Sequence, residues 1–117
     1  MMRKRFSTAA IVTCALDRLV CPIKDVYELL GFMVREDLFT HQLPRASRAS
    51  EPFLKKQCPW LNEINESECN EETVQRWLED IERKFGKSHM IRRMPKRAWK
   101  HIGPLEEIIK IKSGIKL

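Results

Sequence analysis

The sequence predicts a mostly α-helical protein, a small bundle of about five short-to-medium helices joined by irregular connections. Apolar residues recur at three- and four-residue intervals over several segments, which is the period of a helix face. Glycine is scarce, with four residues in 117, and this disfavours a glycine-rich all-β fold. A chain of this length with 43% apolar residues can form one ordinary core, so we expect residues 1–117 to be a single domain.

Two helices are predicted in the first third of the chain. The first runs over about residues 7–18, with Ser7 or Thr8 as its N-cap. Pro22 prevents the first helix from continuing, and a second helix begins directly after it. Gly31 lies inside the second helix and predicts a close contact with another helix, since glycine otherwise only destabilises this position. The apolar face of the second helix is formed by Val26, Leu29, Leu30 and Met33.

Prolines divide the next region. A proline lacks a backbone N–H and is tolerated in the first helical turn, so Pro44, Pro52 and Pro59 are each predicted to start or stop a helix. We expect one short helix from Pro44 to about Ala49. A second helix should be capped by Ser50, carry Pro52 in its first turn and end before Pro59.

The clearest helix lies between Asn70, a good N-cap, and Gly86, a favourable residue for the C-terminal end. After it, residues 88–94 are short and β-tolerant, and they predict an extended segment. The buried stripe of this helix should be Val74, Trp77, Leu78, Ile81 and Phe85.

A last short helix is predicted to begin at Pro104, with Leu105, Ile108 and Ile109 facing inward. The tail, residues 110–117, alternates apolar and cationic residues. It is expected either to extend as a strand or to fray as a mobile end.

Charge is strongly segregated within a net charge of +6. Residues 63–82 carry eight acidic residues against one arginine, and residues 83–117 carry eleven basic residues against two acidic ones. The acidic part is either a solvated face or a surface that imitates a phosphate backbone. The basic part either binds nucleic acid, stays solvated, or pairs with the acidic part. Its nucleic-acid-binding candidates are Arg92, Arg93, Lys96, Arg97, Trp99 and Lys100, since cations interleaved with an aromatic side chain suit phosphates and unpaired bases.

Motifs of catalysis are missing from the sequence. It contains no glycine-rich phosphate loop, no GxSxG elbow and no HExxH helix, so we predict that the protein is not an enzyme. The four cysteines are too far apart for a CxxC pair, and we expect buried thiols and no metal or other cofactor. His41 is expected to be half-buried and to donate a ring N–H to a backbone carbonyl. Since no apolar run is long enough to span a membrane, a cytoplasmic location is expected.

One stretch carries a family resemblance. The run Leu38-Phe39-Thr40-His41-Gln42-Leu43-Pro44-Arg45, followed by similar segments at 51–54 and 57–61, resembles a family of short phage and prophage proteins that has no assigned function. The likeness extends upstream to residues 21–30, is looser downstream, and does not include the basic C-terminal tail. It implies a phage origin, hence a location in the cytoplasm of a bacterial host cell, and no catalytic residues. Small phage proteins commonly act stoichiometrically on a host or defence protein, and inhibitors of CRISPR effectors are one such class.

Two functional hypotheses follow. The first is a non-enzymatic phage-type protein that binds a host protein, as an anti-CRISPR-like inhibitor of a bacterial defence system. The second is a nucleic-acid-binding accessory protein that uses the basic C-terminal third. Arg45 and Arg48 lie three residues apart and either present two guanidinium groups to a partner or pair with Asp37 or Glu51. The candidates for protein binding are Arg45, Arg48, Glu66, Glu68, Glu71 and Glu72.

Overall fold

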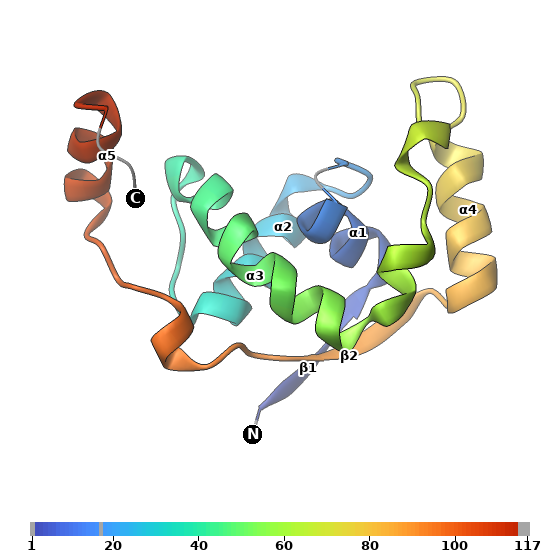
Figure 1. The fold of residues 1–117 in the computed structure, drawn as a ribbon, viewed down its shortest axis with the longest axis horizontal. Coiled ribbons are helices and arrows are strands. Elements are labelled where there is room, and N and C mark those ends of the chain that lie inside the picture. The colour runs from blue at the N-terminus through green and yellow to red at the C-terminus, as the bar shows by residue number, and fades with distance from the viewer. Residues whose placement is uncertain (1, 17, 115–117) are drawn as a thin grey trace.

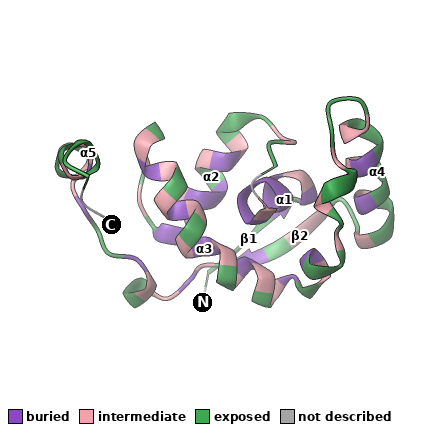
Figure 2. Cartoon of the chain, turned by 45° about the horizontal axis from the view of Figure 1, so that its top comes forward, coloured by how far each residue is buried: buried purple, intermediate pink, exposed green. Residues whose placement is uncertain are grey.

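Three helices pack against one another at the centre of the molecule: α1 (Thr8–Leu16), α2 (Ile23–Val34) and α3 (Leu43–Gln57) (Figure 1). The computed structural model describes residues 2–16 and 18–114. Within these ranges the fold is mostly helical, with five α-helices and one two-stranded sheet, as the sequence predicts. Helix α1 is almost entirely buried (Figure 2), because a helix that is apolar on nearly all sides has to be covered all round.

A two-stranded antiparallel sheet is formed by one strand that precedes the helical core in the chain and one strand that follows it. Ser7 caps α1, since its Oγ accepts a hydrogen bond from the N–H of Ala10 at 3.1 Å. The predicted end of the first helix includes residue 17, which lies outside the described residues. Ahead of α1 lies strand β1 (Arg3–Ser7), which the sequence did not predict. It pairs with β2 (Ser88–Arg92), where an extended segment was predicted.

The turn that ends α2 requires a glycine at position 31. The N–H groups of Arg35 and Glu36 both bond to the carbonyl of Gly31, and Arg35 adopts a left-handed conformation with φ 66°. A Cβ at position 31 would lie 2.9 Å from the carbonyl oxygen of Glu36. The prediction of a contact with another helix was therefore wrong, and the close approach comes from the turn that follows α2.

Helix α3 is continuous through Pro52, so the prediction of two helices separated near Ser50 was wrong. The proline removes one hydrogen bond, the one that its N–H would donate to the carbonyl four residues earlier. Ala46, Ser50 and Leu54 are all buried at four-residue spacing, on the side that packs against α1 and α2. This burial keeps the helix intact across the proline.

Helix α4 (Val74–Phe85) stands at one side of the core. Trp77 and Ile81 are buried as predicted, whereas the other three residues of the predicted stripe are half-buried. Gly86 ends the helix with φ 97°, as expected for a glycine at this position. The predicted N-cap, Asn70, instead accepts N–H bonds in the turn before the helix. The connections contain four short 3₁₀ turns: η1 (Thr40–Gln42), η2 (Pro59–Glu63), η3 (Glu66–Glu68) and η4 (Lys96–Ala98).

Helix α5 (Pro104–Lys112) begins at the predicted proline, but its inward face was predicted wrongly. Leu105 is 77% exposed and Ile109 is 64% exposed, whereas Glu107 is completely buried. The helix is turned so that Glu107 reaches an arginine of α3, and this ion pair sets its rotation. The first residues of the predicted tail, 110–112, belong to α5, and residues 115–117 lie outside the described ranges.

Candidate functional site

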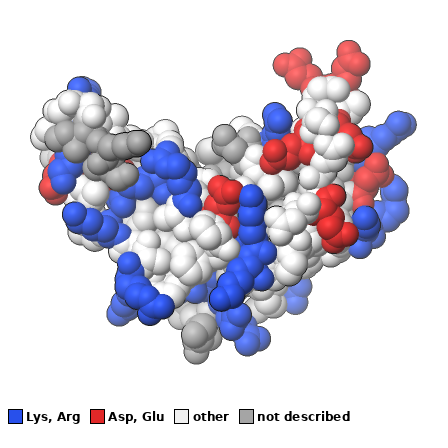
Figure 3. Space-filling model, viewed as in Figure 1, with Lys and Arg blue, Asp and Glu red and all other residues white. Residues whose placement is uncertain are grey.

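Acidic side chains gather in one part of the molecule, whereas basic side chains are spread widely. Carboxylates gather over the segment before α4, and Lys and Arg are distributed over the rest of the visible face, including the part beside α4 (Figure 3). Among residues 2–16 and 18–114, no ion pair joins the acidic segment 63–82 to the basic segment 83–117 except Asp80–Arg83, three residues apart on α4. The idea that the basic part pairs with the acidic part therefore fails for the described residues.

The acidic loop, residues 62–73, is held by its own side chains. Asn65 Oδ1 accepts the backbone N–H of Ser67 at 3.1 Å. Asn70 Oδ1 accepts the N–H groups of Glu72 and Thr73 at 2.8 and 3.0 Å. Such bonds from asparagine side chains fix turns. The carboxylates of this loop are thus presented by an ordered backbone, and they belong to Glu63, Glu66, Glu68, Glu71 and Glu72.

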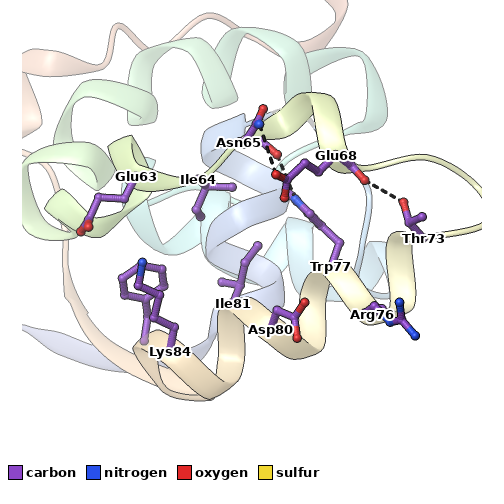
Figure 4. A pocket seen from close by; sticks show the side chains of 11 residues that line it. Glu63, Ile64, Asn65, Glu68, Thr73, Arg76, Trp77, Asp80, Ile81 and Lys84 are labelled. Carbon is purple, nitrogen blue, oxygen red and sulfur yellow. Dashed lines mark hydrogen bonds between the residues drawn. The ribbon is translucent and has the colours of Figure 1, made fainter.

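A bond from Trp77 ties this loop to α4, and a hollow lies between the loop and the helix (Figure 4). The indole Nε1 of Trp77 donates to the carbonyl of Asn65 at 3.0 Å. Within the loop, Thr73 Oγ1 donates to the carbonyl of Glu68 at 2.7 Å. The hollow has a volume of about 380 Å³. Ile64 and Ile81 give it apolar walls, and its charged rim is formed by Glu63, Glu68, Arg76, Asp80 and Lys84.

Of the two arginines expected to contact a partner, only Arg48 is exposed. Arg45 is used inside the protein: its Nη2 lies 2.9 Å from Oε1 of the buried Glu107, and its Nη1 donates to the carbonyl of Lys100 at 2.9 Å. Its guanidinium carbon also lies 3.7 Å from the centre of the Trp99 ring. The ion pair is with Glu107, so neither of the intramolecular partners that the sequence suggested is correct.

The basic candidates divide into exposed and buried side chains. Trp99 is 8% exposed, its Nε1 donates to Glu36 at 2.7 Å, and Arg45 covers its face, so it has no free face for a nucleic-acid base. Arg93 is half-buried, with its guanidinium 4.9 Å from the centre of the Phe32 ring. The remaining four are exposed: Arg92, Lys96, Arg97 and Lys100.

Two arginines of the N-terminal segment join this basic group. Strand pairing places Arg3 opposite Arg92 and Arg5 opposite Met90, about ninety residues away in the chain. The sequence showed the N-terminal basic cluster but gave no sign of its neighbour in space. Residues 3–7 are Arg-Lys-Arg-Phe-Ser, and three successive cations do not alternate as an exposed strand face would, so no local signal predicts this strand.

The histidines and cysteines behave as structural groups. His41 is half-buried and donates its Nε2–H to the carbonyl of Pro104 at 2.9 Å, as predicted. Burial, and to a lesser extent the positive charge of Arg5, lower the pKa of His89, which packs 4.8 Å from the Trp60 ring. Burial raises the pKa of the Cys14 thiol to about 12, and burial also raises the pKa of Cys58. A thiol with a raised pKa is a poor nucleophile at neutral pH.

Within the described part of the chain, no three His, Cys, Asp or Glu side chains come together in a way that could hold a metal ion. The helices described are all too short or too polar to cross a membrane.

Comparison with known proteins gives a family for the helical core. Residues 6–64 match the family described as domain of unknown function (DUF7736). The chain belongs to this family. The matched range contains α1, α2 and α3 together with the run Leu38 to Arg45, whereas α4, β2 and α5 lie beyond it. No curated protein and no solved structure matches the chain.

The DUF7736 range supplies the side chains that hold α5. His41, Gln42 and Arg45 belong to that range, and they contact Pro104 and Glu107, which lie outside it. The run of residues that carries the resemblance is therefore a docking site for a helix of the same chain.

Proposed function

We propose that this DUF7736 protein is a non-enzymatic protein of phage origin that binds a host protein stoichiometrically. Its target would be a protein of a bacterial defence system, in the manner of an anti-CRISPR inhibitor. The contact would be made by the acidic loop, against a basic surface with which the target binds nucleic acid.

One observation supports this proposal above the others: the backbone of the acidic loop is ordered, and none of the ion pairs among the described residues includes a carboxylate of this loop. Four of them, Glu66, Glu68, Glu71 and Glu72, lie within seven residues. A loop that is already ordered loses little conformational entropy on binding, and complementary charge speeds association and selects the partner.

The hollow beside the loop adds a second type of contact. Its apolar walls, formed by Ile64 and Ile81, lie next to the carboxylates of Glu68 and Asp80. A basic protein surface that carries an apolar side chain between its cations would fit this arrangement, since interfaces usually place apolar contacts within a polar rim.

A pull-down from the lysate of a bacterial host with defence systems tests the proposal. The tagged protein should recover a specific partner at a one-to-one ratio, and nuclease treatment of the lysate should not remove it. A tagged protein that recovers nothing specific from hosts with different defence systems would overturn the proposal.

Charge-neutralised variants test the role of the acidic loop. The variant E66Q/E68Q/E71Q/E72Q should lose the partner, because a close opposite-charge contact contributes about 1.5 kcal/mol or more. The matched control D25N/E28Q/D37N/E106Q removes the same charge outside the loop and should retain the partner. Equal loss by both variants would show that net charge, and not the loop, determines binding.

A further inference from the structure

The outer face of the β1–β2 ribbon carries three arginines. Alternate residues of a strand point to opposite sides, and residues paired across two strands share a side. Arg3, Arg5 and Arg92 therefore lie on one face, and all three are exposed. On the opposite face Phe6 and Ile91 are buried in the core, whereas Lys4 is exposed.

This face has an unrelieved electrostatic repulsion. Arg3 lies directly opposite Arg92, and side chains paired in this way have Cβ atoms about 5 Å apart, so like charges there destabilise the pairing. Among the described residues, none of the ion pairs includes Arg3, Arg5 or Arg92. The side chain of Arg5 donates a hydrogen bond to a neutral hydroxyl, Ser88 Oγ, at 2.9 Å. An anionic ligand would relieve the repulsion.

The ribbon is held firmly on the core. Gln57, at the end of α3, accepts the N–H of Arg92 at 2.7 Å and donates to its carbonyl at 3.0 Å. These two bonds occupy the outer edge of β2 and fix the ribbon to α3. The three arginines are therefore presented on a rigid support, which lowers the entropic cost of binding a ligand.

We propose that this face of the ribbon binds duplex DNA. A two-stranded β-ribbon fits the major groove of B-form DNA, which is about 12 Å wide. Arg3, Arg5 and Arg92 would contact the phosphates on either side of the groove. The segment that leaves β2 carries Lys96, Arg97 and Lys100, and these exposed cations would extend the phosphate contacts.

Duplex DNA fits this surface better than single strands or RNA. Proteins that bind single strands stack the bases on aromatic side chains, and the aromatic residue of this basic tract, Trp99, is buried under Arg45. The major groove of duplex RNA is too deep and narrow for side chains to read. The ribbon and the acidic loop are separate surfaces, so this proposal does not depend on the proposed protein partner.

Fluorescence anisotropy with a labelled B-form duplex of about 20 base pairs tests the proposal, at several salt concentrations between about 50 and 200 mM. The affinity should fall linearly with salt on a double-logarithmic plot. In R3Q/R5Q/R92Q, the loss of three phosphate contacts should reduce that slope by about 2.7. The control K24Q/R48Q/K112Q removes three exposed cations of α2, α3 and α5 and should keep the slope.

Charge reversal at one position separates binding from folding. Arg92→Glu places a carboxylate opposite Arg3, so the thermal midpoint should stay unchanged or rise. The same substitution should weaken DNA binding by roughly eightfold or more near 0.1 M salt. Absence of binding to duplex DNA at the lowest salt, equal effects of the ribbon and control variants, or tighter binding to single-stranded DNA or duplex RNA would each overturn the proposal.

Discussion

Replacing Arg45 with alanine should detach α5 from the rest of the protein. The Glu107 carboxylate is completely buried, and Arg45, 12% exposed, provides its charged partner at 2.9 Å. Apart from this pair, α5 has few apolar anchors, because Leu105 and Ile109 point to solvent. The position of the helix therefore depends on a polar network, to which His41 adds one hydrogen bond through the carbonyl of Pro104.

The expected loss follows from the contacts of the Arg45 guanidinium. Removing one partner of a buried ion pair leaves an uncompensated charge, which costs about 3–5 kcal/mol. The lost hydrogen bond to the carbonyl of Lys100 adds about 1 kcal/mol, and the lost contact with the Trp99 ring adds about 1 kcal/mol. When α5 undocks, water hydrates the Glu107 carboxylate. The loss in the free energy of unfolding is therefore smaller than the sum of these three contributions. We expect the free energy of unfolding to fall by about 3 kcal/mol.

Urea denaturation and hydrogen exchange measure the two parts of this prediction. The amides of residues 105–112 should exchange much faster in Arg45→Ala, whereas those of α1 should exchange faster only to the extent that the global free energy of unfolding falls. Arg48→Ala is the matched control, because Arg48 is an exposed arginine on the same helix, and its effect should stay within about 0.5 kcal/mol. Equal effects of the two substitutions would refute the role of the ion pair.

A double substitution tests whether charge or shape holds α5. Nε of Arg45 and Oε2 of Glu107 are buried without a hydrogen-bond partner, so the network is incompletely satisfied. Replacing such a pair with apolar residues is often neutral or stabilising, by about 1–4 kcal/mol. The variant R45M/E107L should therefore recover most of the stability lost in Arg45→Ala. A double variant as unstable as the single one would contradict the electrostatic explanation.

Three further predictions concern α3, β2 and α1. Pro52→Ala should raise the free energy of unfolding by about 1–2 kcal/mol in urea, since an interior proline costs a helix about 3 kcal/mol and its stiffening of the unfolded chain returns about 1 kcal/mol. The pKa of His89 is lowered in the folded state, so the unfolded chain binds the proton more readily, and stability should fall as the pH drops below about 6.5. The thermal midpoint of His89→Gln should show a smaller drop between pH of about 7.5 and 5.5. Cys14 has a pKa raised to about 12 and is buried, so iodoacetamide should modify it only after unfolding, as read by mass spectrometry.

Each of these predictions has a result that contradicts it. A less stable Pro52→Ala variant would mean that the proline ring makes a contact worth more than the missing hydrogen bond. Identical pH profiles for the wild type and His89→Gln would exclude His89 as a source of acid sensitivity. Rapid labelling of Cys14 in the folded protein would show that α1 opens easily.

The helical segments could be predicted from the sequence because the spacing of apolar residues within each segment indicates a helix. The apolar face of α2 correctly predicted that helix, and Gly86 correctly predicted the end of α4, both to within a few residues. Pro52 misled the prediction, because the local rule for proline takes no account of burial. The stripe Ala46, Ser50 and Leu54 packs against two other helices, and that long-range contact outweighs the loss of one backbone bond.

The interaction surfaces could be predicted only in part. The acidic loop was visible as a run of carboxylates, and its exposure agrees with that interpretation. The burial of Trp99 and Arg45 could not be predicted from the sequence. It depends on their contacts with Glu36 and Glu107, respectively, which are far away in the chain. A buried glutamate on a helix with exposed leucine and isoleucine runs against hydrophobic patterning, so no local rule would find it.

The sequence by itself determined the helical class, the segregation of charge, and the lack of a catalytic motif, since these depend on composition and on residues close together in the chain. Only the tertiary structure decided which charges are free. It joined Arg3 and Arg5 to Arg92 across two strands, and it removed Arg45 from the surface by pairing it with Glu107. The physical reason is that exposure and ion pairing depend on distances in space, and chain folding brings together residues that the sequence keeps some sixty to ninety positions apart.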